Sequence, residues 1–249
     1  MSVVNRRLLI RFGAIGDVIL SLPALEAARA IYTEVWAPRP MLPLIRFADR
    51  TRAIADTGLD LVGVVEGARV AELETFDSIY SWYGSNRPEF RDAVRHLPFT
   101  FFPALPPPAE GIPCIAMPKA EVQDFAIIHP FASSPAKRWP LENFREVAAR
   151  LEIPVKWCAG PSEHLPDVTQ SDAIRMDDLY ELACWISTAR VYIGNDSGIA
   201  HLAAAVGTPV IAIFLASDPR VWAPRGERVT VLERPGVAEV VAATQVVLR

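Results

Sequence analysis

The opening of the chain shows the pattern of a strand, a tight turn and a helix. Residues 8–12 form a short apolar run, which predicts a buried strand. Apolar residues then recur at helical spacing from 18 to 31, and Pro23 early in this stretch is expected to kink or restart the helix. Two glycines lie between the apolar run and the helical stretch. This order of strand, turn and helix resembles the start of a βαβ unit.

The same alternation continues along the rest of the chain. In the first half, further strands are predicted at 34–37, 61–65, 77–82 and 99–102, with helical stretches between several of them. In the second half, strands are predicted at 125–130, 154–159, 191–193, 210–214 and 229–232, and helices at 141–150, 178–188, 198–206 and 237–247. Short apolar strands that alternate with helices indicate parallel sheets covered on both faces, an α/β fold.

A proline-rich stretch divides the two halves. Residues 103–118 contain six prolines, and such a segment continues neither a helix nor a central strand. We therefore predict a Rossmann-like domain at 1–105, a semi-rigid linker at 106–118 and a second Rossmann-like domain at 119–249.

Composition narrows the function classes. The 249 residues are 51% hydrophobic and 22% charged with a net charge of −4, so nothing suggests a partner made of nucleic acid. No apolar run approaches the roughly 18 residues of a membrane helix, and no signal-peptide core precedes the first strand. Three cysteines without metal spacing are expected to be reduced and mostly buried, and we expect a cytoplasmic protein.

The first candidate site is the turn that contains Gly13, Gly16 and Asp17. Glycines between a strand and a helix allow close approach of a ligand, and the helix start offers N–H groups to an anion. The turn lacks the Gly-x-Gly-x-x-Gly pattern, so binding of a dinucleotide is a weak interpretation. Asp17 is either the helix N-cap or a carboxylate that accepts a proton at a cleft.

Two further candidate sites follow strands of the second half. Lys137 and Arg138 lie in a loop after 125–130, where they either meet phosphate charge or form a solvated basic loop packed down by Trp139. In the third site Asn195 or Asp196 is expected to cap a helix whose first N–H groups, near Ser197 and Gly198, suit a diphosphate. His201 follows one turn into this helix.

Four motifs, taken together in order, resemble those of the ADP-heptose:lipopolysaccharide heptosyltransferase family. They are Arg-Phe-Gly-Ala-Ile-Gly-Asp-Val at 11–18, Lys-Arg-Trp-Pro at 137–140, Ala-Gly-Pro-Ser-Glu at 159–163, and Gly-Asn-Asp-Ser-Gly-Ile-Ala-His at 194–201 with Gly-Thr-Pro at 207–209. The resemblance implies a GT-B fold, in which two Rossmann-like domains have parallel sheets that face each other across a cleft.

The resemblance also implies an activity and residue roles. It implies inverting, metal-independent transfer of a sugar, a heptose above all, from an ADP-sugar to a lipopolysaccharide-type or other glycan acceptor, with no cofactor. Asp17 would be the general base, and Lys137 would neutralise the leaving diphosphate. Glu163 would hold the donor ribose, while Asp196, Ser197, Gly198 and His201 would bind the phosphates and the sugar.

Other functions stay open at this point. The first is a glycosyltransferase of the same fold with a different donor or acceptor. The second is a protein that binds a nucleotide or glycan without turnover, although the presence of Asp17, Lys137 and Asp196 argues against it. A nicotinamide-dependent oxidoreductase is disfavoured by the missing glycine pattern. A glycolipid acceptor would add peripheral contact with the inner membrane surface.

Overall fold

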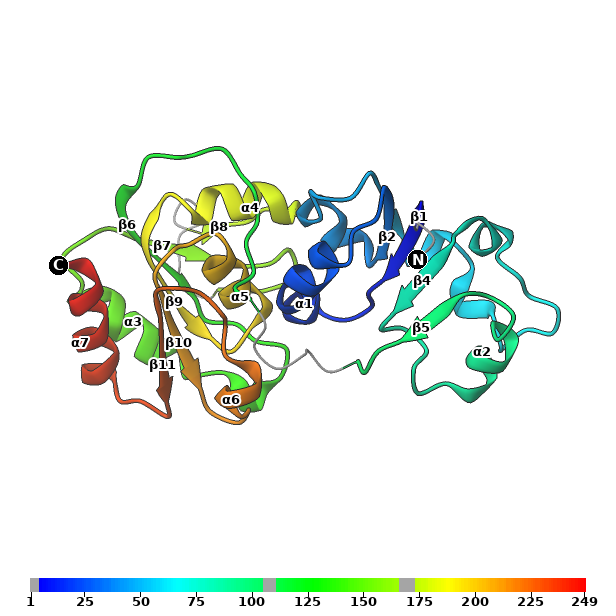
Figure 1. The fold of residues 1–249 in the computed structure, drawn as a ribbon. Coiled ribbons are helices and arrows are strands. Elements are labelled where there is room, and N and C mark those ends of the chain that lie inside the picture. Colours follow the sequence, from blue (N-terminus) through cyan, green and yellow to red (C-terminus); the bar gives the residue numbers. More distant parts are fainter. Residues whose placement is uncertain (1–4, 105–110, 166–172) are drawn as a thin grey trace. The chain divides into compact units, whose positions relative to one another are not determined.

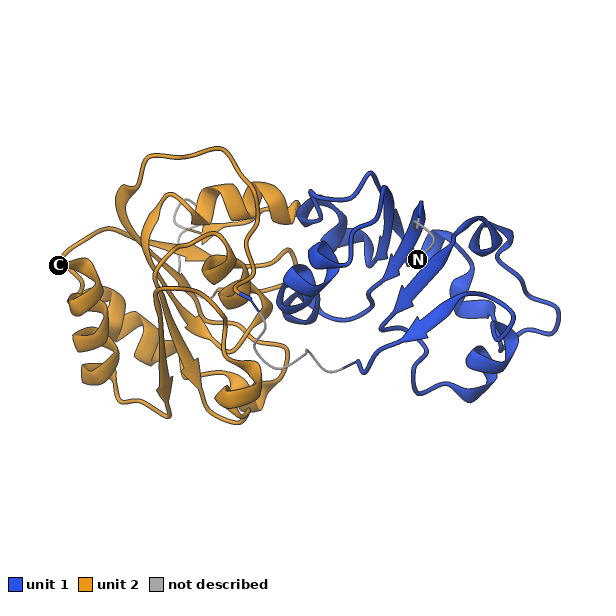
Figure 2. Cartoon of the chain, in the orientation of Figure 1, with its two compact units in different colours: residues 1–111 blue, residues 112–249 orange. Residues whose placement is uncertain are grey.

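The chain consists of two compact α/β units. The computed structural model describes residues 5–104, 111–165 and 173–249, and the two units are Met1–Gly111 and Ile112–Arg249 (Figure 2). The division lies inside the proline-rich stretch, of which residues 105–110 fall outside the described residues. We call the two parts unit 1 and unit 2.

Unit 1 contains a five-stranded parallel sheet with the strand order β3-β2-β1-β4-β5 (Figure 1). Its strands are β1 (Arg6–Ile10), β2 (Tyr32–Ala37), β3 (Arg50–Ala53), β4 (Ser78–Ser81) and β5 (Phe99–Phe101). Its helices are α1 (Ile15–Ala27), α2 (Pro88–Ala93) and the 3-10 helices η1 (Arg39–Leu44), η2 (Ile54–Asp56), η3 (Leu59–Leu61) and η4 (Ala71–Thr75). From β1 the chain adds β2 and β3 on one side of the sheet and then β4 and β5 on the other side. The strand order therefore reverses between β1 and β4.

Unit 2 contains a six-stranded parallel sheet with the order β11-β10-β9-β6-β7-β8. Its strands are β6 (Gln123–His129), β7 (Val155–Cys158), β8 (Ala173–Ile174), β9 (Ala189–Asn195), β10 (Val210–Phe214) and β11 (Val229–Glu233). Its helices are η5 (Pro135–Lys137), α3 (Leu141–Arg150), α4 (Leu179–Ile186), α5 (Gly198–Ala205), α6 (Pro219–Trp222) and α7 (Val237–Leu248). Here the order reverses between β6 and β9.

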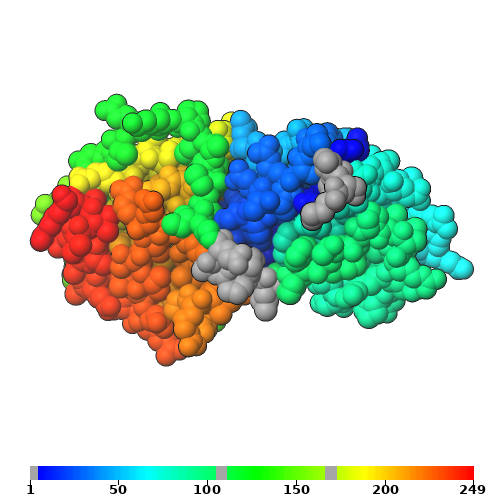
Figure 3. All heavy atoms as spheres, viewed as in Figure 1, coloured from blue at the N-terminus to red at the C-terminus, as the bar shows by residue number. Residues whose placement is uncertain are grey.

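Helices cover both faces of the unit 2 sheet. Helices α3 and α7 pack against each other, and α7 contacts β9 and β10. Helix α5 also contacts these two strands, and Figure 1 shows it with α4 on the other side of the sheet. In Figure 3 the red atoms of α7 lie at the surface of unit 2. All five residues of β10 are buried, because a strand covered on both faces has no solvent side.

The predicted α/β fold with two parallel sheets is confirmed. One predicted strand is wrong: in the run 61–65, Leu61 ends η3 and the residues after it form a turn. Gly58 and Gly63 adopt φ values of +71° and +76°, which bend the backbone on either side of Leu61. Val64 is 66% exposed, so the apolar run does not enter the core.

Helix α1 begins and ends three to four residues earlier than predicted, and it continues through Pro23 without a break. Strand β3 and helix α2 were not predicted from the sequence. Among the described residues, no helix has the length and apolar character needed to cross a membrane.

Candidate functional site

The reversal of strand order in unit 2 brings two loops together at one edge of the sheet. Strands β6 and β9 are neighbours, and His129 pairs with Gly194 near the ends of both. Ligands of open α/β sheets bind at the carboxyl ends of the strands where the order reverses. The loop after β6 carries Lys137, and the loop after β9 carries Asp196 and Ser197, so three predicted site residues follow the two strands at this point.

Lys137 and Asp196 form an ion pair at this edge. Lys137 Nζ lies 2.7 Å from Asp196 Oδ2, and the Ser217 hydroxyl donates to the same oxygen. The Asp196 side chain is only 5% exposed, whereas that of Lys137 is 28% exposed. A buried carboxylate needs such partners, and the ammonium group that satisfies it is also accessible to a ligand.

Asn195 fixes the backbone on both sides of the Lys137 loop. Its Oδ1 accepts a hydrogen bond of 2.9 Å from the Trp139 amide, and its Nδ2 donates one of 2.8 Å to the Pro130 carbonyl. The side chain is fully buried. Within the loop, Arg138 Nε donates to the Ala132 carbonyl. The ten residues that contain Lys137 are therefore held at both ends.

The N-cap of α5 is Ser197, so the expectation that Asn195 or Asp196 caps this helix is wrong. The Ser197 hydroxyl accepts a hydrogen bond of 3.4 Å from the Ala200 amide. Asn195 and Asp196 are unavailable as caps because their side chains are engaged with the Lys137 loop. Gly198 begins the helix, and His201 is 5% exposed one turn further on.

A second set of contacts joins Glu163 to the same edge through His129. His129 Nε2 lies 3.3 Å from Glu163 Oε2, and its Nδ1 lies 3.5 Å from the Ser197 hydroxyl oxygen. The Gly160 amide donates to Glu163 Oε2 at 2.6 Å. Burial would raise the pKa of Glu163, but the hydrogen bonds from His129 and Gly160 outweigh it and lower this pKa. His129 begins the loop segment of the second candidate site in the sequence, but no role was predicted for it.

In unit 1, Asp17 occupies the third position of α1 and the N-cap is Ala14. Asp17 Oδ2 accepts a hydrogen bond of 2.9 Å from the Ala14 amide, as an acidic residue does in a capping box. The interpretation of Asp17 as the N-cap residue itself is therefore wrong. Gly13 has φ +141°, and a Cβ there would lie 2.7 Å from Asp17 Cβ. Gly16 precedes Asp17 in the first turn of the helix.

Arg11 organises the turn that carries Asp17. The guanidinium is buried and donates to the Ser21 hydroxyl and to the carbonyls of Phe12, Asp17 and Ala104. Burial lowers the pKa of Arg11, and the Asp17 carboxylate, 3.8 Å away, acts in the opposite direction. The Asp17 side chain is 25% exposed, so it is fixed by neighbours but still accessible.

The family follows from residues 114–241, which match the sequence model of glycosyltransferase family 9 (heptosyltransferase). This region is just over half of the chain and contains the whole Lys137–Asp196 site. The chain belongs to glycosyltransferase family 9. The expected family is thereby confirmed.

Curated members of the family match over part of their length. The lipopolysaccharide core heptosyltransferase OpsX of Haemophilus influenzae is 29% identical over 111 residues, which are 39% of this chain and 32% of that protein. Lipopolysaccharide heptosyltransferase 3 of Escherichia coli is 50% identical over 44 residues, 18% of this chain and 13% of that protein. The matches thus span a third or less of these relatives.

The fold is that of solved family 9 structures. ADP-heptose lipopolysaccharide heptosyltransferase II of E. coli aligns with a TM-score of 0.74 at 17% identity, over 98% of both chains. The E. coli heptosyltransferase WaaC with ADP aligns with a TM-score of 0.65 at 17% identity, over 98% of this chain and 99% of that one.

Within the described part of this chain, no group of three or more His, Cys, Asp or Glu side chains is arranged to hold a metal ion.

Proposed function

We propose that this family 9 protein is an inverting, metal-independent glycosyltransferase that moves a heptose from an ADP-sugar to a lipopolysaccharide-type or other glycan acceptor. The observation that carries the proposal is the Lys137–Asp196 pair at the β6/β9 reversal point, inside the region that matches the family. This point of the sheet is where an open α/β fold binds its ligand.

The donor would bind to unit 2. Lys137 supplies an accessible positive charge, and the first N–H groups of α5 can receive phosphate oxygens. Glu163 would accept hydrogen bonds from the ribose hydroxyls through its carboxylate, whose pKa is lowered by the hydrogen bonds from His129 and Gly160. His129 would orient Glu163 through their contact.

The chemical step would be a single displacement. The acceptor hydroxyl oxygen attacks the anomeric carbon, the bond from that carbon to the diphosphate oxygen breaks, and ADP departs. Asp17 takes the hydroxyl proton, and Lys137 stabilises the charge that develops on the leaving phosphate. One displacement inverts the anomeric configuration. Lys137 and the α5 amides supply the positive charge for which other transferases use a metal.

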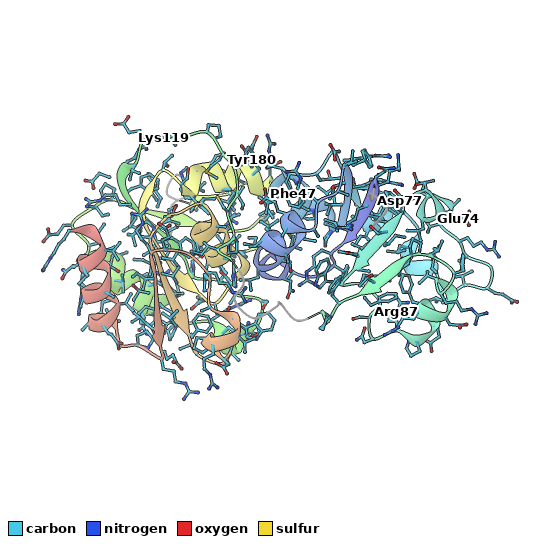
Figure 4. The ribbon with its side chains drawn as sticks, viewed as in Figure 1. Phe47, Glu74, Asp77, Arg87, Lys119 and Tyr180 are labelled. Atoms are coloured by element: carbon cyan, nitrogen blue, oxygen red, sulfur yellow. The ribbon has the colours of Figure 1, made fainter. Side chains whose placement is uncertain are left out.

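The test is transfer from ADP-heptose to a heptose-deficient core oligosaccharide. The reaction is measured by ADP release, by mass spectrometry of the product and by NMR of the new anomeric proton. Rates should be equal with and without a chelator. Lys137→Ala should lower kcat about a hundredfold, since loss of a charge stabiliser costs about 3 kcal/mol in the barrier. Lys119, an exposed lysine labelled in Figure 4, provides the matched control: Lys119→Ala should leave the rate unchanged.

Three results would contradict the proposal. A chelator that abolishes transfer would remove metal independence, and a normal rate for Lys137→Ala would remove Lys137 from the mechanism. Thermal stabilisation by ADP without transfer to any glycan would instead indicate a nucleotide-binding protein without turnover, because a ligand of the native state raises stability by mass action alone.

A further inference from the structure

Unit 1 has its own point of reversed strand order, and aromatic side chains follow both of its strands. Strands β1 and β4 are neighbours, with Ile10 paired to Ser81. Phe12 and Tyr83 each stand two residues beyond this pair, at the carboxyl edge of the sheet. This is the position at which ligands of open α/β sheets bind.

The two aromatic rings contact each other, and one of them is open to solvent. The Phe12 and Tyr83 rings meet edge to face, with centroids 6.0 Å apart at an angle of 66°. Tyr83 packs in turn against the buried Phe90, at 5.3 Å. Phe12 is 55% exposed. Ligand sites are lined mainly by hydrophobic and aromatic side chains, so an exposed aromatic that contacts a second ring is a candidate ligand contact.

A cation adjoins the aromatic pair. Arg87, the residue before α2, places its Cζ 5.4 Å from the Tyr83 ring centroid and donates a hydrogen bond to the Tyr83 hydroxyl. Arg87 is labelled on unit 1 in Figure 4. A guanidinium has five N–H donors. Within the described residues, the bond to the Tyr83 hydroxyl is the one hydrogen bond that the Arg87 guanidinium makes. Polar donors therefore stand beside an apolar surface.

Both aromatic residues are fixed through their backbones. The Arg11 guanidinium donates to the Phe12 carbonyl at 2.6 Å, and the same guanidinium donates to the Asp17 carbonyl. The Ser81 hydroxyl donates to the Tyr83 carbonyl and accepts from the Tyr83 amide. The Phe12 backbone is thus held by the same guanidinium that contacts the Asp17 backbone, so the exposed ring extends from an ordered segment.

We propose that Phe12, Tyr83 and Arg87 form a saccharide-binding subsite of unit 1. A pyranose has one face made largely of C–H bonds, which would lie on the Phe12 ring, while its hydroxyls or a carboxylate at its rim would meet Arg87. That the bound saccharide is the acceptor rests on the function proposed above. The subsite then identifies the acceptor as a sugar recognised through its apolar ring face together with a polar or acidic rim, and it brings that sugar to Asp17.

The test measures binding of a core oligosaccharide, released from rough lipopolysaccharide by mild acid, to the full chain without donor. Saturation-transfer NMR should detect binding to the wild type. Phe12→Ala should weaken it about tenfold, and Phe12→Trp should retain it because the aromatic face remains. Arg87→Gln should weaken it severalfold. Ile31→Ala is the control, since Ile31 is 71% exposed and lies away from this edge, before β2.

The outcomes separate the two proposals. No binding by the wild type, or Phe12→Ala within twofold of it, would overturn the subsite. Binding that depends on Phe12, with no transfer from ADP-heptose, would leave the subsite standing and reject the proposed activity. Transfer with an unchanged acceptor KM in Phe12→Ala would support the activity and reject the subsite.

Discussion

Replacing Asn195 by alanine removes two buried hydrogen bonds at once. The Trp139 amide and the Pro130 carbonyl would each lose a partner in a region where the Asn195 side chain is fully buried. Each buried polar group left without a partner costs about 1–3 kcal/mol. The expected loss is therefore about 2–6 kcal/mol in the free energy of unfolding of unit 2.

The same change should also disturb catalysis, because the loop that Asn195 holds carries Lys137. We expect Asn195→Ala to lower the melting temperature by about 4–24 °C, given about 2–4 °C per kcal/mol for a chain of this size. The rate of ADP release should fall towards that of Lys137→Ala. In the double variant the two rate losses should not add, because both remove the same placed ammonium group.

The assay pairs melting curves of the full chain with ADP release at a temperature at which every variant is folded. Because the two units can unfold separately, the transition of unit 2 is the one to follow. A loss of less than about 1 kcal/mol, or a variant whose activity still falls a hundredfold on adding Lys137→Ala, would refute the reasoning.

Three further changes test other contacts. Asp17→Asn keeps an oxygen for the Ala14 amide, so we expect normal melting with a rate lowered about 10²–10⁴-fold; a rate within a few-fold of wild type would place the base elsewhere. The pKa of Glu163 is lowered in the folded state, so ionised Glu163 stabilises the fold at pH values above its ordinary pKa of 4.5. The difference in melting temperature between wild type and Glu163→Gln should therefore shrink as the pH falls below 4.5, and a difference that stays constant would argue against this contribution. In Gly194→Ala the new Cβ would lie 2.6 Å from the Tyr192 hydroxyl, so melting scans should show a loss of about 1–3 kcal/mol.

The sheets could be predicted from the sequence because their strands are continuous apolar runs. Strand β10 is an example: all five residues are apolar, and all five are buried. The run at 61–65 is apolar apart from Gly63, but Gly58 and Gly63 adopt positive φ and keep it out of the core, and a local pattern does not show which way a glycine bends. Strand β3, Arg-Thr-Arg-Ala at the sheet edge, was missed because edge strands need little apolar content.

The site was predictable as a set of residues but not as a set of contacts. The order of the motifs was enough to predict Lys137 and Asp196 as site residues. They are separated by 58 positions, however, and their ion pair depends on β6 lying beside β9 in the sheet. The choice of cap depended on tertiary contacts as well. Asn195, Asp196 and Ser197 are all good caps, and only the folded loop shows that the first two are occupied.

The hydrogen bond from Arg11 to the Ala104 carbonyl has a mechanical consequence. Ala104 lies in the proline-rich stretch and is the last described residue before 105–110, and the guanidinium that binds it also binds the carbonyls of Phe12 and Asp17. A displacement of the backbone at Ala104 would therefore act on the turn that bears the proposed base through the Arg11 side chain, in addition to acting on β5 through the chain. A change that moves Ala104 away from Arg11 would in this way alter the alignment of Asp17.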